Sequence, residues 1–386
     1  MNVLVLNSGS SSQKSALFAI PAGDLTEDPL KPLWKNEIEW KPGEENRKSA
    51  IRSLLGSIWS GPKAVLSGPE QIHGVGHRVV HGGRYLFDPT LLTPAVEKEI
   101  SDAAKFAPLH NRSELEGVAI IRDLLGNVPQ VAVFDTGFHR TLPPAAAMYP
   151  GPYEWLQQGI RRYGFHGINH QYCARRAPQL LKADPGTLKL ISCHLGNGCS
   201  LAAINGGKSV DTTMGFTPLD GLMMGTRSGS LDPGILTFLM RESSGSAKQG
   251  SKDLDDTLNH KSGLLGISGV SGDMREVVKA SKSGNERATL AFDMFVHHLR
   301  AGIAAMAASL GGVDAIVFTA GIGEHSPEVR TTTCEGLAFL GVKLDSAKNA
   351  DSKADSIISV PDSRVIVLVI AAQEDWEIAR QTSQLV

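Results

Sequence analysis

Two stretches of the chain share one pattern, an apolar run that breaks into glycine and small polar residues and then resumes. In the first, residues 3–6 are apolar, Asn7 and a serine–glycine tract follow, and Lys14 comes next. In the second, residues 190–193 are apolar and 194–198 break the run. Short apolar runs joined by turn residues are typical of strand–turn–strand units. Because glycine-rich turns leave backbone N–H groups open to an anion, the pattern predicts a duplicated fold with two phosphate-binding turns facing one cleft.

The rest of the chain contains further strand-like and helix-like segments. We expect strands at 72–83, 131–134, 201–204, 209–213, 314–320 and 365–370, and helices at 49–58, 93–104, 113–125, 285–310 and 375–383. The 285–310 helix is apolar on most sides, so we expect it to be buried. The proline- and alanine-rich stretch 140–152 is the expected domain boundary.

Composition narrows the class of protein. A chain of 386 residues exceeds one ordinary core, so two domains are expected. The net charge of −2 gives no reason to expect nucleic acid or an anionic membrane as a partner. The four cysteines form no CxxC pair, which favours reduced thiols. The chain opens directly into a strand and no apolar run reaches about 18 residues, so we expect a cytoplasmic protein.

Residues 72–83, IHGVGHRVVHGG, contain a histidine at every fourth position. On a helix, His73, His77 and His81 would form a metal-binding face, but the glycines and valines predict a strand instead. On a strand, Arg78 and Val80 share one face. A guanidinium beside a compact aliphatic group suits a small carboxylate with a short tail. A structural salt bridge of Arg78 is an equally open interpretation.

Other positions have groups suited to anion chemistry. Asp135 follows the 131–134 strand, at the carboxyl end where ligands collect in α/β sheets, although a loop-capping role is equally open. His166 lies between an aromatic residue and a glycine, where a lone histidine is usually structural. Arg227 lies in a glycine-rich loop and suits charge stabilisation at a transferring phosphoryl group. Residues 321–325 turn from a strand into glycines, a second place for a ligand to approach.

Nine segments, in order along essentially the whole chain, resemble the acetate kinase family: VLNSGSSSQK, GHRVVHGG, FAPLHN, VFDTGFHRTLP, RRYGFHG, SCHLGNG, MGFTPLDGLMMGTRSG, FTAGIGEH and QEDWEIAR. The combination is specific, whereas no single fragment would be. The family belongs to the superfamily of sugar kinases, heat-shock ATPases and actin. The resemblance implies an α/β fold of two duplicated ribonuclease-H-like (actin-like ATPase) domains flanking a nucleotide cleft. The expected domains are 1–137, joined by the C-terminal helix 376–386, and 138–375, which would carry nucleotide binding and dimerisation.

The resemblance also implies an activity and a set of residues. The activity is reversible, Mg²⁺-dependent phosphoryl transfer from ATP to acetate, giving acetyl phosphate and ADP, in a homodimer, with Mn²⁺ as an alternative metal. The implied roles are catalysis by Asp135, His166 and Arg227; substrate binding by Arg78, Val80, Leu109, Phe165 and Pro218; Mg²⁺ binding by Asn7 and Glu374; and ATP or ADP binding by Lys14, His194, Leu195, Gly196, Asn197, Gly198, Asp273, Met274, Arg275, Gly321, Ile322, Gly323, Glu324 and His325.

Within this scheme, Arg78 takes the acetate carboxylate and the apolar residues line the methyl pocket. Acetic acid has a pKa of about 4–5 and is ionised at pH 7, so no proton needs to be removed. We therefore expect Asp135 to orient Mg²⁺ or an arginine and not to act as a base. The chain departs from the family pattern at Ser8, Gln13, Ser15, Ile168, Asn169, Ser230 and His325. The last stands where asparagine is common, which puts the nucleotide preference in doubt.

Three other functions remain open at this point. A propionate or butyrate kinase of the same family differs by methylene groups, each worth only about 1–3 kcal/mol of discrimination, and Val80 favours the shorter acid. A sugar or glycerol kinase would need a polar surface in place of Val80, Leu109 and Phe165. An ATP-dependent binding module related to actin has no use for Arg78 and Arg227, and its ATP hydrolysis would be indifferent to acetate.

Overall fold

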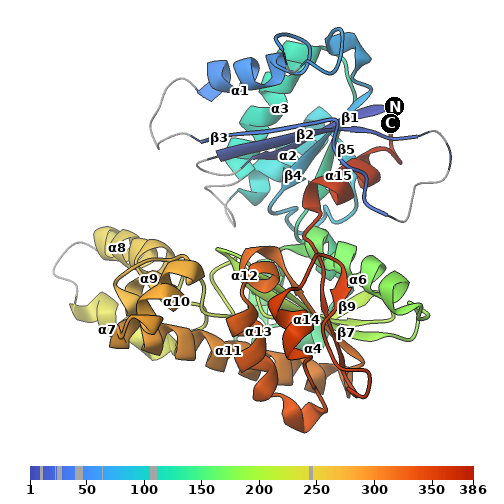
Figure 1. Ribbon diagram of the computed structural model, residues 1–386. Helices are drawn as coiled ribbons and strands as arrows, with labels where there is room; N and C mark the ends of the chain where they lie inside the picture. Colours follow the sequence, from blue (N-terminus) through green and yellow to red (C-terminus); the bar gives the residue numbers. More distant parts are fainter. Residues whose placement is uncertain are drawn as a thin grey trace. The chain divides into compact units, whose positions relative to one another are not determined.

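The computed structural model describes residues 1–8, 12–21, 23, 28–39, 47–62, 64–104, 111–242 and 247–386. Its contacts divide the chain into two compact units (Figure 1). Unit 1 comprises Met1–Arg140, His166–Tyr172 and Gln373–Val386, and unit 2 comprises Thr141–Phe165 and Cys173–Ala372. The first division thus follows Arg140, where residue 137 was expected, and a short segment of the middle of the chain joins unit 1, which the sequence did not predict.

The strands of unit 1 are β1 (Asn2–Ser8), β2 (Ser12–Ala19), β3 (Trp34–Glu39), β4 (Gly74–Val79), β5 (Thr90–Leu91) and β6 (Gln130–Phe134). They form one mixed sheet in the order β3-β2-β1-β4-β6-β5. The first three strands form an antiparallel meander, β1 is parallel to β4, β4 is parallel to β6, and β5 is antiparallel to β6. The carboxyl ends of β1, β4 and β6 therefore meet at one edge of the sheet.

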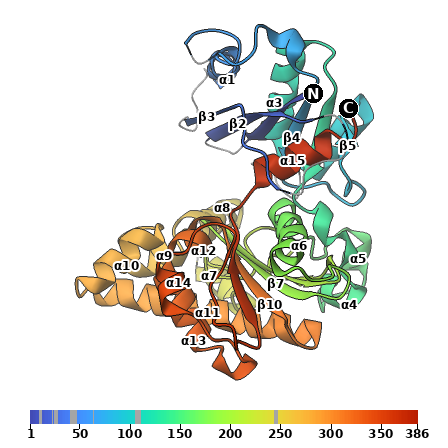
Figure 2. The same ribbon diagram turned by 45° about the vertical axis from the view of Figure 1, so that its right-hand side comes forward.

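The helices of unit 1 are α1 (Arg47–Gly56), α2 (Pro94–Ala103), α3 (Asn111–Leu125), α15 (Glu374–Thr382), the first turns of α6 (Gly167–Leu181), and the 3₁₀ turns Pro69–Gln71 and Gly137–Thr141. Helices α1 and α3 cover one face of the sheet and α15 the other, as Figures 1 and 2 show. The alternation of side chains along β1 explains this arrangement. Leu4 and Leu6 pack into the cluster with α1 and α3. On the opposite face, Phe18 contacts Trp376 of α15, with ring centroids 5.7 Å apart.

The strands of unit 2 are β7 (Lys189–Leu195), β8 (Cys199–Asn205), β9 (Lys208–Thr212), β10 (Ala315–Thr319), β11 (Ser356–Ile357) and β12 (Ile366–Val369). Their order, β9-β8-β7-β10-β12-β11, repeats that of unit 1 strand for strand. The directions repeat as well, because β7, β8 and β9 form a meander, β10 and β12 run parallel to β7, and β11 is antiparallel to β12. The duplicated actin-like fold predicted from the sequence is confirmed.

The helices of unit 2 are α4 (Pro144–Ala147), α5 (Glu154–Gln157), α7 (Pro233–Glu242), α8 (Ala247–His260), α9 (Gly263–Ser268), α10 (Met274–Lys282), α11 (Glu286–Leu310), α12 (Ala320–His325), α13 (Pro327–Glu335), α14 (Ser346–Ala350), the 3₁₀ turn Ala338–Leu340 and the later turns of α6. Helix α11 begins at the Asn285 cap and ends at Gly311, whose φ of 62° suits glycine. No helix in the described part of the chain is long and apolar enough to cross a membrane.

Three local expectations need correction. Strand β7 continues through His194 and Leu195, so only residues 196–198 form the turn. Helix α11 is buried along one side only, with Leu290 53% exposed, because α9, α10 and α13 together with strands β8 and β9 pack along that side. The glycine segment at 320–325 is a short helix and not an open turn. In each case, packing on the sheet decided what local composition left ambiguous.

Candidate functional site

A cluster of charged and polar groups lies at the carboxyl edge of the unit 1 sheet. Asn7 comes from β1, Arg78 from β4, and Asp135 directly follows β6. The Arg78 Nη2 atom donates to Asp135 Oδ2 at 2.6 Å, and its Nε donates to both carboxylate oxygens at 3.1 Å. The Arg78 Nη1 atom donates to Asn7 Oδ1 at 3.0 Å. Three adjacent parallel strands thus place one cation, one carboxylate and one amide together.

The Arg78–Asp135 pair is largely withdrawn from solvent, since the two side chains are 20% and 1% exposed. Burial by itself lowers the pKa of Arg78, but the charges of Asp135 and Glu374 and the hydrogen bonds to Asp135 raise it above its ordinary value. The guanidinium is therefore a fixed cation. Among the described residues, its bonds use the Nε–H, one Nη1–H and one Nη2–H. One N–H on each terminal nitrogen remains, and such a pair forms a fork that matches a carboxylate.

Asp135 also fixes the start of helix α6. Its main-chain carbonyl accepts a hydrogen bond from Gly167 N at 2.8 Å, and a Cβ on Gly167 would collide with that carbonyl oxygen. The preceding residue, His166, has a φ of 55°, a left-handed conformation that non-glycine residues rarely adopt. The sequence-predicted residues Asp135 and His166 are thus joined through one backbone hydrogen bond. Strained backbone of this kind is concentrated at functional sites.

The predicted substrate-pocket residues have different outcomes. Val80 follows β4 and is 7% exposed, and its N–H donates to Glu114 Oε1 at 3.1 Å. Phe165 is 1% exposed and belongs to unit 2. Pro218, also in unit 2, offers its carbonyl to Arg227 Nη1 at 3.2 Å. Leu109 lies outside the described residues.

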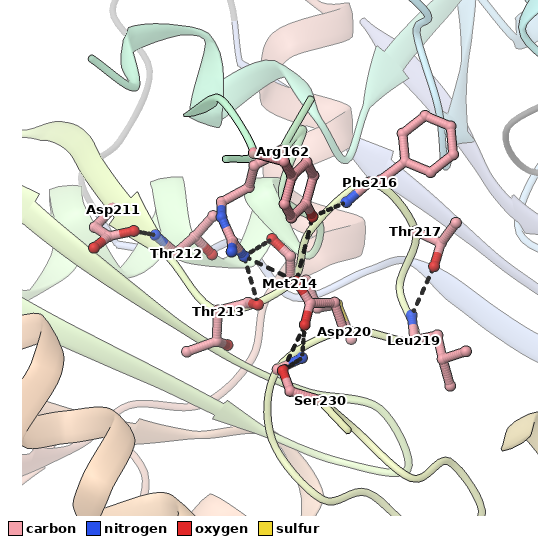
Figure 3. Close-up of polar contacts among 12 residues, drawn as sticks. Arg162, Asp211, Thr212, Thr213, Met214, Phe216, Thr217, Leu219, Asp220 and Ser230 are labelled. Atoms are coloured by element: carbon pink, nitrogen blue, oxygen red, sulfur yellow. Dashed lines mark hydrogen bonds and ion pairs between the residues drawn. The ribbon is translucent and has the colours of Figure 1, made fainter. Parts of the chain in front are cut away.

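The loop that holds Pro218 and Arg227 is fixed by a polar network that the sequence analysis missed (Figure 3). Arg162 Nη1 donates to the carbonyls of Thr213 and Met214 at 2.8 and 3.1 Å and forms an ion pair with Asp220 at 3.3 Å. Ser230 Oγ donates to Asp220 Oδ1 at 2.5 Å. The signal was present, since RRYGFHG and TPLDG were both noted as motifs, but neither spacing nor residue type indicated that the two segments meet.

The turn between β1 and β2 lies outside the described residues, but its flanks are described. Ser8 and Gln13 face each other across the two strands, and Ser8 Oγ donates to Gln13 Oε1 at 2.6 Å. Gln13 Nε2 also contacts Ser15 Oγ at 3.4 Å. Three departures from the family pattern are therefore one mutually bonded group. Lys14 is 49% exposed and lies 3.6 Å from Glu37 of β3.

Asn7, Asp135 and Glu374 supply oxygen atoms of the kind that Mg²⁺ prefers. Glu374 is the first residue of α15 in unit 1, and its charge acts on Arg78. Within the described residues, no three His, Cys, Asp or Glu side chains form a metal cage. Mg²⁺ is usually held by one or two carboxylates together with substrate phosphates and waters, so this donor set fits the metal.

Unit 2 contains a cavity of about 360 Å³ whose lining combines glycines with a few polar side chains. Its walls are the turn after β7, the start of α10, and α12 with the residue that follows it. The lining residues are Gly196, Asn197, Gly272, Asp273, Met274, Arg275, Gly321, Ile322, His325 and Ser326. All but two of these were predicted as nucleotide-binding residues from the sequence. Gly272 and Ser326 were missed, although each adjoins a predicted segment.

The α10 wall of this cavity is held by a local ion pair. Asp273 caps the helix by accepting from Arg275 N at 2.9 Å, and its carboxylate pairs with the Arg275 guanidinium at 2.5 Å. The hydrogen bond from Arg275 lowers the pKa of Asp273 below its ordinary value. Asn197, which lines the cavity, is packed closely against Gly225. A Cβ on Gly225 would collide with Asn197 Oδ1, and Gly225 N donates to Asn197 O at 3.1 Å.

Besides Lys14 of unit 1, five predicted nucleotide residues of unit 2 do not line the cavity: His194, Leu195, Gly198, Gly323 and Glu324. The first two are buried strand residues. Gly198 closes the turn, its carbonyl accepting from Gly196 N at 3.0 Å. Gly323 packs against the end of β10, and the Glu324 carboxylate accepts from the N–H of Ala372 at 2.9 Å.

A buried arginine supports the α12 wall of the cavity, and no sequence motif indicated this role. Arg330 is 1% exposed and donates to the carbonyls of Gly323 and Glu324, both at 2.8 Å. It also donates to the side chain and carbonyl of Asn349 and to Ser352. Burial lowers the pKa of Arg330 to about 10. The guanidinium thus holds the carboxyl end of α12 in place.

The fold, the Arg78 cluster of unit 1 and the cavity of unit 2 together define a class of protein. Two copies of an actin-like sheet, one ending in a cation–carboxylate cluster and the other beside a nucleoside-sized cavity, define an actin-like ATPase-type α/β fold. The comparisons specify the family. Residues 2–380 match the model of the acetokinase family, and the chain belongs to that family.

Relatives of known name support the assignment over the full length. The chain is 53% identical to an acetate kinase of Gloeobacter violaceus, covering 100% of this chain and 99% of the relative. Among solved structures, it resembles Porphyromonas gingivalis acetate kinase, with a TM-score of 0.89, 39% identity, and coverage of 100% and 99% of the two chains. It also resembles a propionate kinase from Francisella tularensis, with a TM-score of 0.88, 36% identity and full coverage of both chains.

Proposed function

We propose that this chain is an acetate kinase, which transfers the γ-phosphoryl group of ATP reversibly to acetate. The observation that carries the proposal is the Arg78 cluster: Asp135 and Asn7 hold the guanidinium so that one N–H on each terminal nitrogen is available to a small carboxylate. The 53% identity to an acetate kinase over the whole chain supports the same substrate. ATP or ADP would occupy the unit 2 cavity.

In the proposed mechanism, a carboxylate oxygen of acetate attacks the γ-phosphorus in line with the departing ADP oxygen, and charge spreads over the equatorial phosphoryl oxygens. Arg78 binds the acetate carboxylate through the remaining fork. Arg227 and His166 stabilise the developing charge, because each donates hydrogen bonds and a guanidinium is permanently cationic. When bound, Mg²⁺ neutralises phosphate oxygens, and Asn7 and Glu374 would hold it.

Asp135 has a positioning role in this proposal. Acetate is already ionised at pH 7, so the reaction needs no base. The bidentate bond from Arg78 Nε and Nη2 fixes the plane of the guanidinium. The Asp135 carbonyl fixes the α6 turn that presents His166. If Asp135→Asn kept wild-type turnover and Mg²⁺ dependence, this role would be wrong.

The experiment is a hydroxamate assay of acyl phosphate formed from ATP, Mg²⁺ and acetate, propionate or butyrate. We expect acetate to give the highest kcat/KM, with propionate within about 10- to 200-fold because one methylene is worth about 1–3 kcal/mol. A preference for propionate would favour the second candidate, a propionate kinase, for which the Francisella tularensis structure is the specific observation. ATP hydrolysis that ignores all three acids would reject both. We further propose a homodimer, which analytical ultracentrifugation tests.

A further inference from the structure

Glu324 was predicted to bind the nucleotide, yet its carboxylate is directed elsewhere. Its Oε1 atom accepts a hydrogen bond from the main-chain N–H of Ala372 at 2.9 Å. Glu324 belongs to helix α12, and Ala372 lies in the same unit. One carboxylate thus joins α12 to a segment 48 residues further along the chain.

The segment that Glu324 holds contains one of the four points at which the chain passes from one unit to the other. The chain leaves unit 2 at Ala372 and enters unit 1 at Gln373. Glu374, the proposed Mg²⁺ donor, follows at once as the first residue of α15. The bond at Ala372 holds the chain three residues after the end of β12 and immediately before Gln373. It therefore fixes the end of the segment that leads to Glu374.

The other end of the connection is the nucleotide cavity. Helix α12 supplies Gly321, Ile322 and His325 to the cavity lining. The helix starts at Ala320, whose φ of 64° is a left-handed conformation that an alanine adopts at a cost. Glu324 lies in the same helix, so its bond to Ala372 joins a wall of the cavity to the last residue of unit 2 before the chain enters α15.

A second carboxylate, that of Asp355, also contacts the 371–373 connection. Asp355, with a φ of 59°, accepts from the N–H of Ala371 at 3.4 Å and pairs with Arg176 Nε at 2.9 Å. Two carboxylates therefore bind two consecutive N–H groups of the connection. Burial and the nearby charge of Asp355 raise the pKa of Glu324, while its hydrogen bonds from Ala372 and Ala320 and the charge of His325 oppose the shift.

From this arrangement we propose that Glu324 is a positioning residue that holds the nucleotide-lining helix α12 and the 371–373 connection as one body, so that nucleotide binding stabilises the connection leading to Glu374. The residue touches neither substrate in this account and acts through the backbone of Ala372. The kinetic part of the proposal rests on the acetate kinase function proposed above, and the binding part does not.

The first experiment measures hydrogen exchange of the amides of residues 371–373 with and without saturating ADP. ADP is expected to slow exchange of these amides in the wild-type chain. Glu324→Ala should speed their exchange by about tenfold, as expected for loss of a hydrogen bond to a charged acceptor, and should abolish the ADP effect. Glu324→Gln, whose amide oxygen still accepts from Ala372, should keep most of it. Exchange at 371–373 that ignores ADP in the wild-type chain would overturn the proposal without any variant.

The second experiment compares kcat, KM for ATP and acetate, and the Mg²⁺ concentration for half-maximal activity. Glu324→Ala should lower kcat by about 10- to 100-fold, the cost of misplacing a reacting group by about 1 Å, with both KM values within about threefold. Glu324→Gln should stay within about fivefold of wild type. Glu328→Ala is the control, because this carboxylate pairs with Lys282 at 2.7 Å near α12 without touching the connection.

The outcomes separate the two proposals. A wild-type chain that forms no acyl phosphate would reject the proposed function, and the exchange measurement with ADP would still decide the role of Glu324. Glu324→Ala with wild-type kcat but a lower melting temperature would show a purely structural residue and overturn the positioning role. Equal losses in the Ala and Gln variants would overturn it too, because hydrogen-bond acceptance would then not be the operative property.

Discussion

The two units share one sheet topology but differ in what stands at the carboxyl ends of equivalent strands. In unit 1, Asn7 and Arg78 lie next to the last residues of β1 and β4, Asp135 follows β6, and Arg78 bonds to both Asn7 and Asp135. In unit 2, β7 ends at a glycine turn and β10 runs into α12, and both face a cavity. At the carboxyl ends of these strands, unit 1 has charged side chains, whereas unit 2 has a glycine turn and a short helix beside a cavity.

This difference assigns different tasks to the two copies. A side-chain cation held by a carboxylate recognises a small anion by geometry, since the fork of a guanidinium matches a carboxylate. Glycine turns and a short helix leave room for a nucleoside and place backbone groups near it. We infer that duplication supplied one scaffold and that the sequence at three strand ends separated carboxylate binding from nucleotide binding.

The largest expected effect concerns Arg227, the unit 2 residue that we propose stabilises charge on the transferring phosphoryl group. Arg227→Ala should lower kcat by about 10³-fold or more with a KM change under about threefold, on the scale of arginines that act in the transition state. Steady-state kinetics in both directions measure it. Arg241→Ala, on an exposed part of α7, is the matched control. A change confined to KM would reassign Arg227 to ground-state binding.

The second prediction is that lowering the pH destabilises unit 1 more than unit 2. Strand β4 carries His77, and His81 follows it, both buried, whereas its counterpart β10 has no ionisable side chain. Burial lowers the pKa of each histidine to about 4, although a hydrogen bond to Gln130 partly offsets this for His77. The unfolded chain, with an ordinary pKa of about 6.5, takes up the protons first, so stability is full above pH 6.5 and is lost as the pH falls toward 4.

The size of this acid effect is about 3 kcal/mol for each imidazole, from a pKa change of two to three units. Hydrogen exchange between pH 7 and 4.5, corrected for intrinsic rates, should show unit 1 opening before unit 2. The exposed His73 provides a control, since His73→Gln should leave the profile unchanged. Simultaneous opening of both units, or earlier opening of unit 2, would contradict the prediction.

A smaller effect is expected from adding one methyl group behind the cavity. A Cβ at Gly225 would collide with the side chain of Asn197, so Gly225→Ala should raise the Kd for ADP about tenfold while the KM for acetate stays within about threefold. Calorimetric titration measures the first and kinetics the second. Gly56→Ala is the control, because nothing lies within 4 Å of its Cβ position and its φ is not positive. Unchanged ADP affinity in Gly225→Ala would contradict the assignment of this cavity as the nucleotide site.

The smallest effect concerns the length of the acid. Val80 is 7% exposed and adjoins Arg78, so Val80→Ala should enlarge the space beside the bound carboxylate. We expect kcat/KM for propionate relative to acetate to rise about three- to tenfold, the range that one methylene allows. The hydroxamate assay with both acids measures the ratio. An unchanged ratio would place the acyl tail elsewhere.

The sequence predicted most strands of the two sheets and the helices α1, α2, α3, α11 and α15, because their local signals agree with their packing. Thr93 caps α2 and Asn285 caps α11, each by accepting from the backbone three residues on. The α12 segment was mistaken for a turn because two glycines lower helix propensity, and its bonds to Arg330, which hold the helix, are tertiary. Strand ends were thus predictable, whereas contacts that depend on the folding of distant segments were not.

For the site as well, the sequence predicted residue types but not the contacts between distant segments. The residue types of Arg78 and Asp135 indicated anion chemistry, but their mutual bond joins positions 57 residues apart. The sequence left open whether Arg78 forms a structural ion pair or binds substrate, and the geometry allows both through different N–H groups. The direction of the Glu324 side chain could not be read from its motif, since a glutamate in a glycine-rich segment has no preferred partner until the 371–373 connection is in place.

The division of tasks between the units is tested most directly by titrating metal-free ADP and measuring acetate kinetics for Arg78→Lys, a variant that keeps a cation beside the buried Asp135. The account predicts that ADP binds within about twofold of wild type while kcat/KM for acetate falls at least about tenfold, because lysine lacks the planar fork. Loss of ADP affinity to the same extent as acetate would contradict it.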